Sequence, residues 1–270
     1  MPVEHKQQSS KQPVGSYQSV ACSSSPSKVL IQAIPLYRPD WQAKAYWGFS
    51  ELPYHQLLSL RSTFLHTEEE ALFANLIPLR RKEDFLRGRY AAKHTLSLYQ
   101  SNVIPNTTFI KPGVFQQPTV VGCQPNLPAI SIAHGDQRAD SLVFPPEHPM
   151  AIDIEKLKME NPQHISSQTT DHERRLLSIA GENEAHFYTR LWTIKEALSK
   201  VLTTGLMVPL EIYQVEDITY KNGYTVSTFT NFEQYKAISL IYASWVCTLV
   251  LPKNTDCLPD FTLVPFSQGK

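Results

Sequence analysis

Short apolar segments bounded by turn residues predict β-strands along most of this chain. Residues 29–36 and 45–52 are the first two such segments, and each is rich in β-branched or aromatic side chains. The same pattern predicts six further strands, over residues 129–134, 141–144, 150–155, 211–217, 225–230 and 237–251. The last of these segments is long and apolar throughout.

Helical signals fall between the strands. Thr67 is followed by three glutamates, which predicts an N-cap with acidic residues in the first turn of a helix over residues 67–76. After Pro78 a longer helix is predicted over 81–99. Two more helices are predicted over 171–180 and 184–203, with Gly181 and Gly205 ending them.

The chain divides into a tail and two halves. Residues 1–28 contain eight Ser, four Gln and three Pro, a composition that predicts disorder. Residues 103–128 are rich in proline and mark a boundary between lobes at residues 29–125 and 126–270. Because each half offers helices and a few strands, we expect an α+β fold with two similar lobes.

Composition excludes several classes of protein. The 25 basic and 25 acidic residues cancel, which gives no support for binding to nucleic-acid phosphates. The four cysteines form no C-x-x-C pair, so neither a zinc site nor a disulfide scaffold is expected, which fits a reducing cytoplasm. With no apolar run of about 18 residues and no secretory signal, no membrane segment is expected.

Two carboxylates lie on the predicted strand 150–155. Asp153 and Glu155 are two positions apart, so they share one face, while Ile152 and Ile154 point into the core. Such a pair suits a hard cation such as Mg²⁺. The alternative is a solvated strand face, because a D-x-E sequence is common.

The predicted helix 184–203 carries an unusual polar face. Glu196 lies almost opposite the apolar stripe, with Trp192 and Lys200 to either side. An ordinary exposed face with a Glu–Lys pair is one interpretation. The large Trp192 side chain favours the other, in which a ligand or a second lobe covers this face.

Basic residues supply a candidate anion pocket. His134 ends a predicted strand beside a glycine and could donate to a phosphate. On the helix 81–99, Lys82, Arg89 and Lys93 fall roughly on one stripe, and arginine matches phosphate oxygens well. A structural histidine and a solvated helix face are the alternatives.

In their order and spacing these segments resemble the 4′-phosphopantetheinyl transferase superfamily. The matching stretches are S-I-A-H, A-I-D-I-E, F-Y-T-R-L-W-T-I-K-E-A-L-S-K and the upstream R-R-K-E-D-F-L-R-G-R-Y-A-A-K. The resemblance covers roughly residues 65–251. It is closest to the larger, pseudo-dimeric enzymes that serve siderophore, polyketide or peptide synthases, since the short trimeric acyl-carrier synthases are about half this length.

The resemblance implies transfer of the 4′-phosphopantetheine arm of coenzyme A to a serine of an apo carrier protein, with release of adenosine 3′,5′-bisphosphate. It also implies a monomer, while cysteine usage, charge and hydropathy lead us to expect a cytoplasmic protein with no nucleic-acid or membrane partner. By the same resemblance, Asp153, Glu155 and Glu196 match the Mg²⁺ ligands. The other implied roles are pyrophosphate binding by Lys200, general base catalysis by Glu173, and phosphate binding by Arg81, Arg89 and His134.

The sequence departs from the family pattern at a few positions. Ala151 replaces a usual glycine, and Ala133 and Gly135 replace serines around the histidine. Phe115 stands where a lysine often precedes the Gln116-Gln117-Pro118 turn, which weakens the expected grip on coenzyme A. Two alternatives remain open: a non-catalytic binder of coenzyme A or a carrier protein, and another Mg²⁺-dependent phosphotransferase or pyrophosphate hydrolase.

Overall fold

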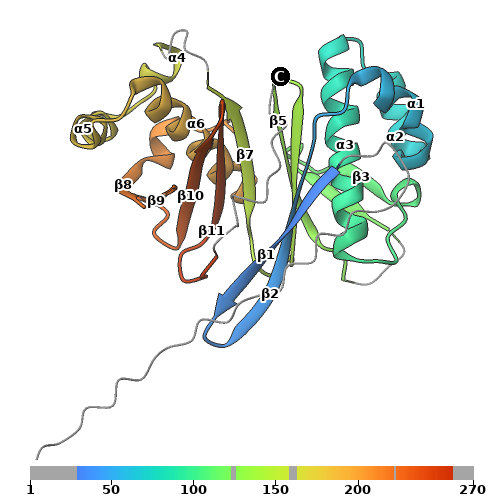
Figure 1. The fold of residues 1–270 in the computed structure, drawn as a ribbon, viewed down its shortest axis with the longest axis horizontal. Helices are drawn as coiled ribbons and strands as arrows, with labels where there is room; N and C mark the ends of the chain where they lie inside the picture. Colours follow the sequence, from blue (N-terminus) through green and yellow to red (C-terminus); the bar gives the residue numbers. More distant parts are fainter. Residues whose placement is uncertain (1–28, 123–125, 158–162, 222, 258–270) are drawn as a thin grey trace, which may run out of the picture.

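The structure is a computed structural model that describes residues 29–122, 126–157, 163–221 and 223–257. The predicted tail, residues 1–28, lies outside the described residues. Two lobes stand side by side, with their sheets toward the centre of the molecule and their helices toward the outside (Figure 1). The predicted α+β fold with two lobes is confirmed. Among the described helices, none is long and apolar enough to span a membrane.

The first lobe is built on a four-stranded antiparallel sheet in the order β1-β2-β6-β5. Its strands are β1 (Val29–Arg38), β2 (Trp41–Ser50), β5 (Ala129–Gly135) and β6 (Arg138–Phe144). The helices are α1 (Tyr54–Phe64), α2 (Thr67–Ala74), α3 (Leu79–Tyr99) and the short 3₁₀ helix Pro105–Thr107. A separate hairpin follows, made of β3 (Phe109–Pro112) and β4 (Pro118–Val121).

The second lobe has a five-stranded antiparallel sheet in the order β7-β11-β10-β9-β8. The strands are β7 (Ala151–Lys156), β8 (Val215–Tyr220), β9 (Thr225–Phe229), β10 (Tyr235–Tyr242) and β11 (Trp245–Pro252). Its helices are α4 (Gln163–Ser166), α5 (Asp171–Ala180) and α6 (Glu184–Val201), with the 3₁₀ helix Leu210–Tyr213 before β8.

The two lobes repeat one order of elements. In the first, β2 precedes three helices and then β3, β4, β5 and β6; in the second, β7 precedes three helices and then β8, β9, β10 and β11. In both lobes the last strand pairs with the strand that precedes the helices: β6 lies beside β2, and β11 lies beside β7. This repetition makes the lobes structural counterparts.

Apolar packing and a few polar contacts join the lobes. Side chains from both sheets share one buried core, which includes Leu36, Trp47, Ile152 and Leu249. Strands β5 and β7 lie next to each other, where the backbone N–H of Ile152 donates to Ser131 Oγ over 3.2 Å. The site described below lies on β7, one of the two strands at this joint.

The chain passes from the first sheet to the second later than the lobe boundary predicted at residues 125 and 126. Strands β5 and β6 pair with β2 in the first sheet, so the change of sheet falls between Phe144 and Ala151. The proline-rich stretch 103–128 holds the β3–β4 hairpin, which the sequence analysis did not predict.

Two further predictions are corrected, and one helix was missed. The single strand over 237–251 is two strands joined by a tight turn, in which Ala243 has a φ of +49°. Helix α1 was not predicted. The N-cap of α2 is His66 rather than Thr67, because the His66 ring accepts a hydrogen bond from the Glu68 N–H over 3.2 Å.

Candidate active site

Strand β7 places two carboxylates on one face, as predicted. Ile152 and Ile154 are buried in the shared core, and Asp153 and Glu155 alternate with them. Asp153 stands directly opposite Thr248 of β11 and is itself buried, with 3% of its surface exposed. A buried carboxylate needs a cation or hydrogen-bond donors to offset its desolvation.

Helix α6 supplies the groups that face Asp153. Its apolar stripe of Phe187, Leu191, Ile194 and Leu198 is buried, and this fixes the opposite face toward β7. Lys200 Nζ lies 2.6 Å from Asp153 Oδ1 and also donates to the Ile152 carbonyl over 3.2 Å. The strand and the helix therefore meet through a direct ion pair.

Negative charge is crowded at this meeting point. The pKa of Glu196 is raised to about 8, first by burial, then by the charge of Asp153 and, more weakly, that of Glu155, while Lys200 acts in the opposite direction. Burial alone would lower the pKa of Lys200, but Asp153 and Glu196 outweigh it, so this pKa is raised and the ammonium form is favoured. Three carboxylates thus share one cationic side chain.

The donor set fits a divalent cation, although the side chains are not yet gathered as ligands. Within the described ranges, no three His, Cys, Asp or Glu side chains come close enough together to hold a metal ion. Lys200 donates a hydrogen bond to Oδ1 of Asp153. The other oxygen, Oδ2, is buried and would accept a hydrogen bond from Glu196 if that carboxyl were protonated. Carboxylate oxygens with excess negative charge are the ligands that Mg²⁺ prefers.

Glu173, to which the resemblance assigns the general-base role, is held by a network of its own in this structure. It is fully buried near the start of α5, where it forms a capping box with Thr170. Its oxygens accept from the N–H groups of Thr170 and Val215, and Lys195 Nζ lies 2.9 Å away. A base must reach the proton that it removes, and this carboxylate is enclosed by its own partners.

The predicted basic stripe on α3 is divided between the surface and the interior. Lys82 is partly exposed and lies over the Phe73 ring, whereas Lys93 is fully buried and pairs with Glu69 over 2.7 Å. Arg81, beside Lys82 in the sequence, is exposed. Arg89 keeps 13% of its side chain exposed, contacts Glu69 at 3.0 Å and lies over the Phe85 ring. Lys93 is therefore a structural residue. Its partner Glu69, which was not among the predicted site residues, also contacts Arg89.

His134 packs against α3 at a glycine. A β-carbon on Gly88 would lie 2.4 Å from His134 Nε2, so any larger residue at position 88 would displace the ring. His134 is an exposed residue, although its ring packs against α3. The protein around the ring disfavours the charged form by desolvation, and the charges of Lys200 and Arg89 act in the same direction, so the pKa of His134 is lowered to about 4. The ring is therefore neutral and accessible to an anion.

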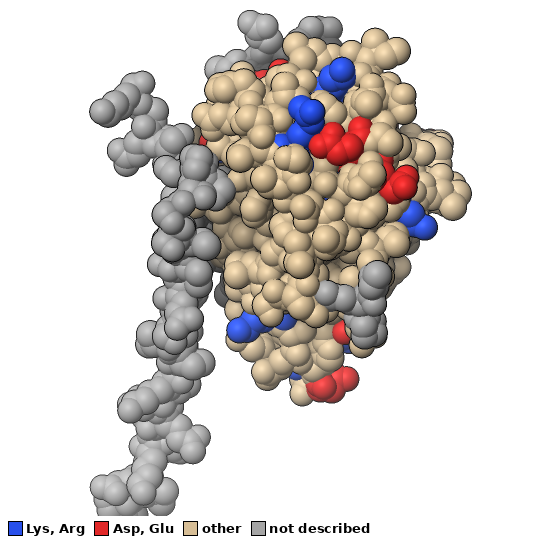
Figure 2. All heavy atoms as spheres, turned by 90° about the vertical axis from the view of Figure 1, so that its right-hand side faces the viewer, with Lys and Arg blue, Asp and Glu red and all other residues tan. Residues whose placement is uncertain are grey.

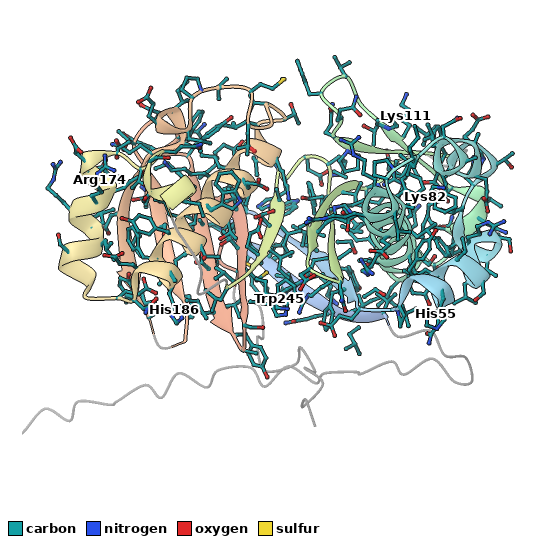
Figure 3. All side chains as sticks on the ribbon, turned by 90° about the horizontal axis from the view of Figure 1, so that it is seen from above. His55, Lys82, Lys111, Arg174, His186 and Trp245 are labelled. Carbon is teal, nitrogen blue, oxygen red and sulfur yellow. The ribbon has the colours of Figure 1, made fainter. Side chains whose placement is uncertain are left out.

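An open pocket of about 820 Å³ lies on the second lobe beside α6. Trp192, one helical turn before Glu196, forms part of its wall, which explains the large side chain on the polar face of this helix. Uncharged groups make up most of the lining: Ser167, Gln168, Thr169, Thr170, Leu206, Val208, Pro209 and Leu210. Arg174, also at the cavity, lies on the outer side of the second lobe, across the molecule from Lys82 (Figure 3).

Packing explains one of the departures from the family pattern. A β-carbon at Gly135 would lie 2.3 Å from the Trp245 ring, so a serine cannot replace this glycine unless Trp245 moves. Trp245 stands between the two lobes (Figure 3). Ala133 is buried in the shared core, and Phe115 is 54% exposed in the β3–β4 turn. These three positions therefore add no polar group to the site.

Charge on the helical side of the first lobe is mixed. Basic and acidic side chains stand in small neighbouring groups there, without a continuous basic patch (Figure 2). At the start of α3, Asp84 pairs with Arg80 and with Arg87, both at 3.9 Å.

Residues 149–250 match the model of the 4′-phosphopantetheinyl transferase superfamily. This segment is less than half of the chain and contains Asp153, Glu155, Glu196 and Lys200. No curated protein matches the sequence.

Two solved structures share a distant likeness. One is a holo-(acyl-carrier-protein) synthase from Bacillus anthracis in complex with CoA (3′,5′-ADP), with 16% identity, a TM-score of 0.31, and coverage of 43% of this chain and 94% of that one. The other is holo-[acyl-carrier-protein] synthase from Thermotoga maritima, with 14% identity, a TM-score of 0.29, and coverage of 46% and 69%.

Proposed function

We propose that this protein transfers the 4′-phosphopantetheine group of coenzyme A to a serine of an apo acyl or peptidyl carrier protein, with Mg²⁺ as cofactor. Adenosine 3′,5′-bisphosphate is the leaving product. The proposal includes the larger, pseudo-dimeric type of enzyme, because the element order of one lobe is repeated in the other. Carriers of siderophore, polyketide or peptide synthesis are the proposed substrates.

One observation carries this proposal: Lys200 of α6 pairs with Asp153 of β7 at 2.6 Å and also feels the charges of Glu196 and Glu155, inside the segment that matches the superfamily. Burial acts first to raise the pKa of Glu196, and the negative charges of Asp153 and Glu155 raise it further, while Lys200 acts in the opposite direction. A binding module without chemistry has no need for this arrangement, because burying several charges together is costly.

The proposed chemistry depends on positioning and on charge stabilisation. In phosphoryl transfer the reacting oxygens are aligned, and charge is spread over the phosphate oxygens. Mg²⁺, held by Asp153, Glu155 and Glu196, would neutralise that charge. Lys200, whose raised pKa keeps it cationic, donates to an oxygen of the pyrophosphate, and His134, Arg89 and Arg81 bind the phosphates of coenzyme A.

The cavity beside Trp192 supports a long, neutral ligand group. It lies one turn along α6 from Glu196, and its lining is mostly uncharged. The pantetheine arm is a flexible chain of amides and methylenes, which suits such a lining. Trp192 therefore contributes a wall to the arm while Glu196 and Lys200 act at its phosphate end.

Intact-mass spectrometry tests the reaction. An apo carrier protein is incubated with this protein, coenzyme A and Mg²⁺, and a parallel sample contains EDTA. We expect the carrier to gain the mass of one phosphopantetheine group in the first sample only. Coenzyme A binding without mass gain on several unrelated carriers would support a non-catalytic binder instead.

A second test separates this activity from general pyrophosphate chemistry. Arg81→Ala removes an exposed guanidinium that we assign to the phosphates of coenzyme A, so the KM for coenzyme A should rise about 10-fold or more. Hydrolysis of inorganic pyrophosphate, if the protein carried it out, would hardly change. A variant with unchanged KM would remove Arg81 from the proposed site.

A further inference from the structure

Each lobe contains a buried ion pair of the same design. In the first lobe, Glu69 is the third residue of a capping box and accepts from the N–H groups of His66 and Ile110 over 2.9 and 3.0 Å. Lys93, from the following helix, lies 2.7 Å from the same carboxylate. Both side chains are fully buried.

The second lobe repeats this arrangement with different residues. Glu173 accepts from the N–H groups of Thr170 and Val215, each over 3.0 Å, and Lys195 of α6 lies 2.9 Å away. The side chains of Glu173 and Lys195 are 0% and 3% exposed. Three elements are thereby joined: the start of α5, the start of β8 and the middle of α6.

A second anchor fixes the other side of α6. Thr193 Oγ1 and Thr248 Oγ1 are 2.7 Å apart, and Thr248 in turn contacts Ser239 Oγ at 2.8 Å. Thr193 therefore holds α6 to the sheet, and Lys195, about 200° around the helix, holds it to α5. Two anchors on different faces restrict the rotation of a helix about its axis.

We propose that the Glu173–Lys195 pair is a positioning clasp that sets the rotation of α6 at which Glu196 meets Asp153. This inference rests on the proposed function and assigns Glu173 no proton transfer. Side chains extend about 5–6 Å from the axis of a helix, so a rotation of about 20° moves Glu196 by about 2 Å. Misplacement of a catalytic group by about 1 Å can slow an enzyme about 100-fold.

The clasp predicts a specific pattern in three variants, Glu173→Gln, Lys195→Met and the double variant. Each single variant leaves one buried charge without its partner, so we expect kcat to fall about 100-fold. The double variant removes both charges, and the amide oxygen introduced by Glu173→Gln can still accept one backbone hydrogen bond, so kcat should recover at least about 10-fold over Lys195→Met. The KM for coenzyme A should stay within about 3-fold in all of them, because both side chains are buried and neither is assigned to the phosphates.

A matched control comes from the same helix. Arg190 of α6 pairs with Glu182 and is also buried, but it lies at the α5–α6 turn and near β8, away from Asp153. Arg190→Met should therefore destabilise the protein while kcat remains within about 3-fold of the wild type. Equal loss of kcat in Arg190→Met and Lys195→Met would show that any loss of an ion pair in α6 is sufficient, and would overturn the clasp.

Hydrogen exchange gives a measurement that does not depend on activity. The amides of Thr170 and Val215 donate to Glu173, so their exchange should accelerate at least about 10-fold in Lys195→Met and remain slow in Arg190→Met. A wild type that exchanges slowly here but transfers nothing would retain the clasp and reject the proposed function. A Glu173→Gln variant with no turnover, beside a fully active Lys195→Met, would instead establish Glu173 as a base and overturn the clasp.

Discussion

The two lobes share a scaffold but differ in what they place on it. Thr95 of α3 contacts Ser141 of β6 at 2.8 Å, and Ser141 stands opposite Gly48 of β2. In the second lobe, Thr193 contacts Thr248, which stands opposite Asp153. The two hydroxyl pairs therefore show that Gly48 and Asp153 occupy equivalent positions in the two lobes.

Packing decides what each matched position can hold. A β-carbon at Gly48 would lie 2.0 Å from Thr95 Oγ1, so no side chain fits there, whereas β7 carries Asp153 at that place. Three residues after each helix threonine, the first lobe has Leu98 and the second has Glu196. The comparison teaches that both lobes keep a buried Glu–Lys pair, while the first lobe packs closely at the matched positions and the second places carboxylates there. We therefore expect one site in each chain.

Removing a carboxylate from the second lobe should have the largest effect. Asp153→Asn and Glu196→Gln should each lower the transfer rate at least about 1,000-fold, about 4 kcal/mol of transition-state stabilisation, because a ligand of the proposed Mg²⁺ site is lost. Far-UV circular dichroism should remain unchanged. Leu98→Ala, at the matched position of the first lobe, is the control and should transfer at nearly the normal rate.

Breaking the buried Glu69–Lys93 pair of the first lobe should lower mainly the stability of the protein. Lys93→Met leaves the fully buried Glu69 without its cation and should lower the free energy of unfolding by about 3–5 kcal/mol. Urea denaturation measures this loss. Adding Glu69→Gln to the same protein should recover a large part of it, and a double variant no more stable than Lys93→Met would contradict the assignment of a paired buried charge.

Gly88→Ala should weaken coenzyme A binding with little effect on the stability of the protein. Alanine is a better helix former than glycine by about 1 kcal/mol, but the added carbon would push His134 from α3. We expect the KM for coenzyme A to rise about 10-fold with little change in melting temperature. Gly122→Ala, where the nearest atom would be 3.9 Å away, should leave both values unchanged.

The smallest expected effect is on the pH dependence of stability. The pKa of His134 falls from its usual 6.5 to about 4 on folding, through desolvation of the ring where it packs against α3 and through the charges of Lys200 and Arg89. Between these values the unfolded chain binds more protons, so stability should decrease as the pH falls from about 6.5 toward 4. Thermal melts of His134→Gln should show a weaker decrease than the wild type. Identical pH profiles would mean that His134 is not held neutral in the folded state.

Local sequence signals predicted much of the second lobe. The alternation around Asp153 is a local pattern, and so is the end of α5 at Gly181, which has a φ of +61°. The apolar stripe of α6 likewise predicted the face that carries Glu196. Hydrophobic periodicity and capping act over a few residues, so the sequence alone expresses them.

The missed features depend on contacts between distant residues. Glu173 matched a catalytic position in the family pattern, but its partners Lys195 and Val215 lie 22 and 42 residues away. The turn at Ala243 has a positive φ without glycine or asparagine, so no local signal divided the long apolar segment. Lys93 fell on a basic stripe by its spacing, yet the fold buries it against Glu69.

Calorimetric titration of the wild type with coenzyme A, in the presence of Mg²⁺ and then of EDTA, tests the central claim most directly. The claim is that the second lobe alone carries an Mg²⁺-dependent site for coenzyme A. We predict one coenzyme A bound per chain, with affinity that falls in EDTA and is insensitive to Mg²⁺ in Asp153→Asn. Two bound molecules per chain, or an unchanged Mg²⁺ dependence in Asp153→Asn, would contradict the account.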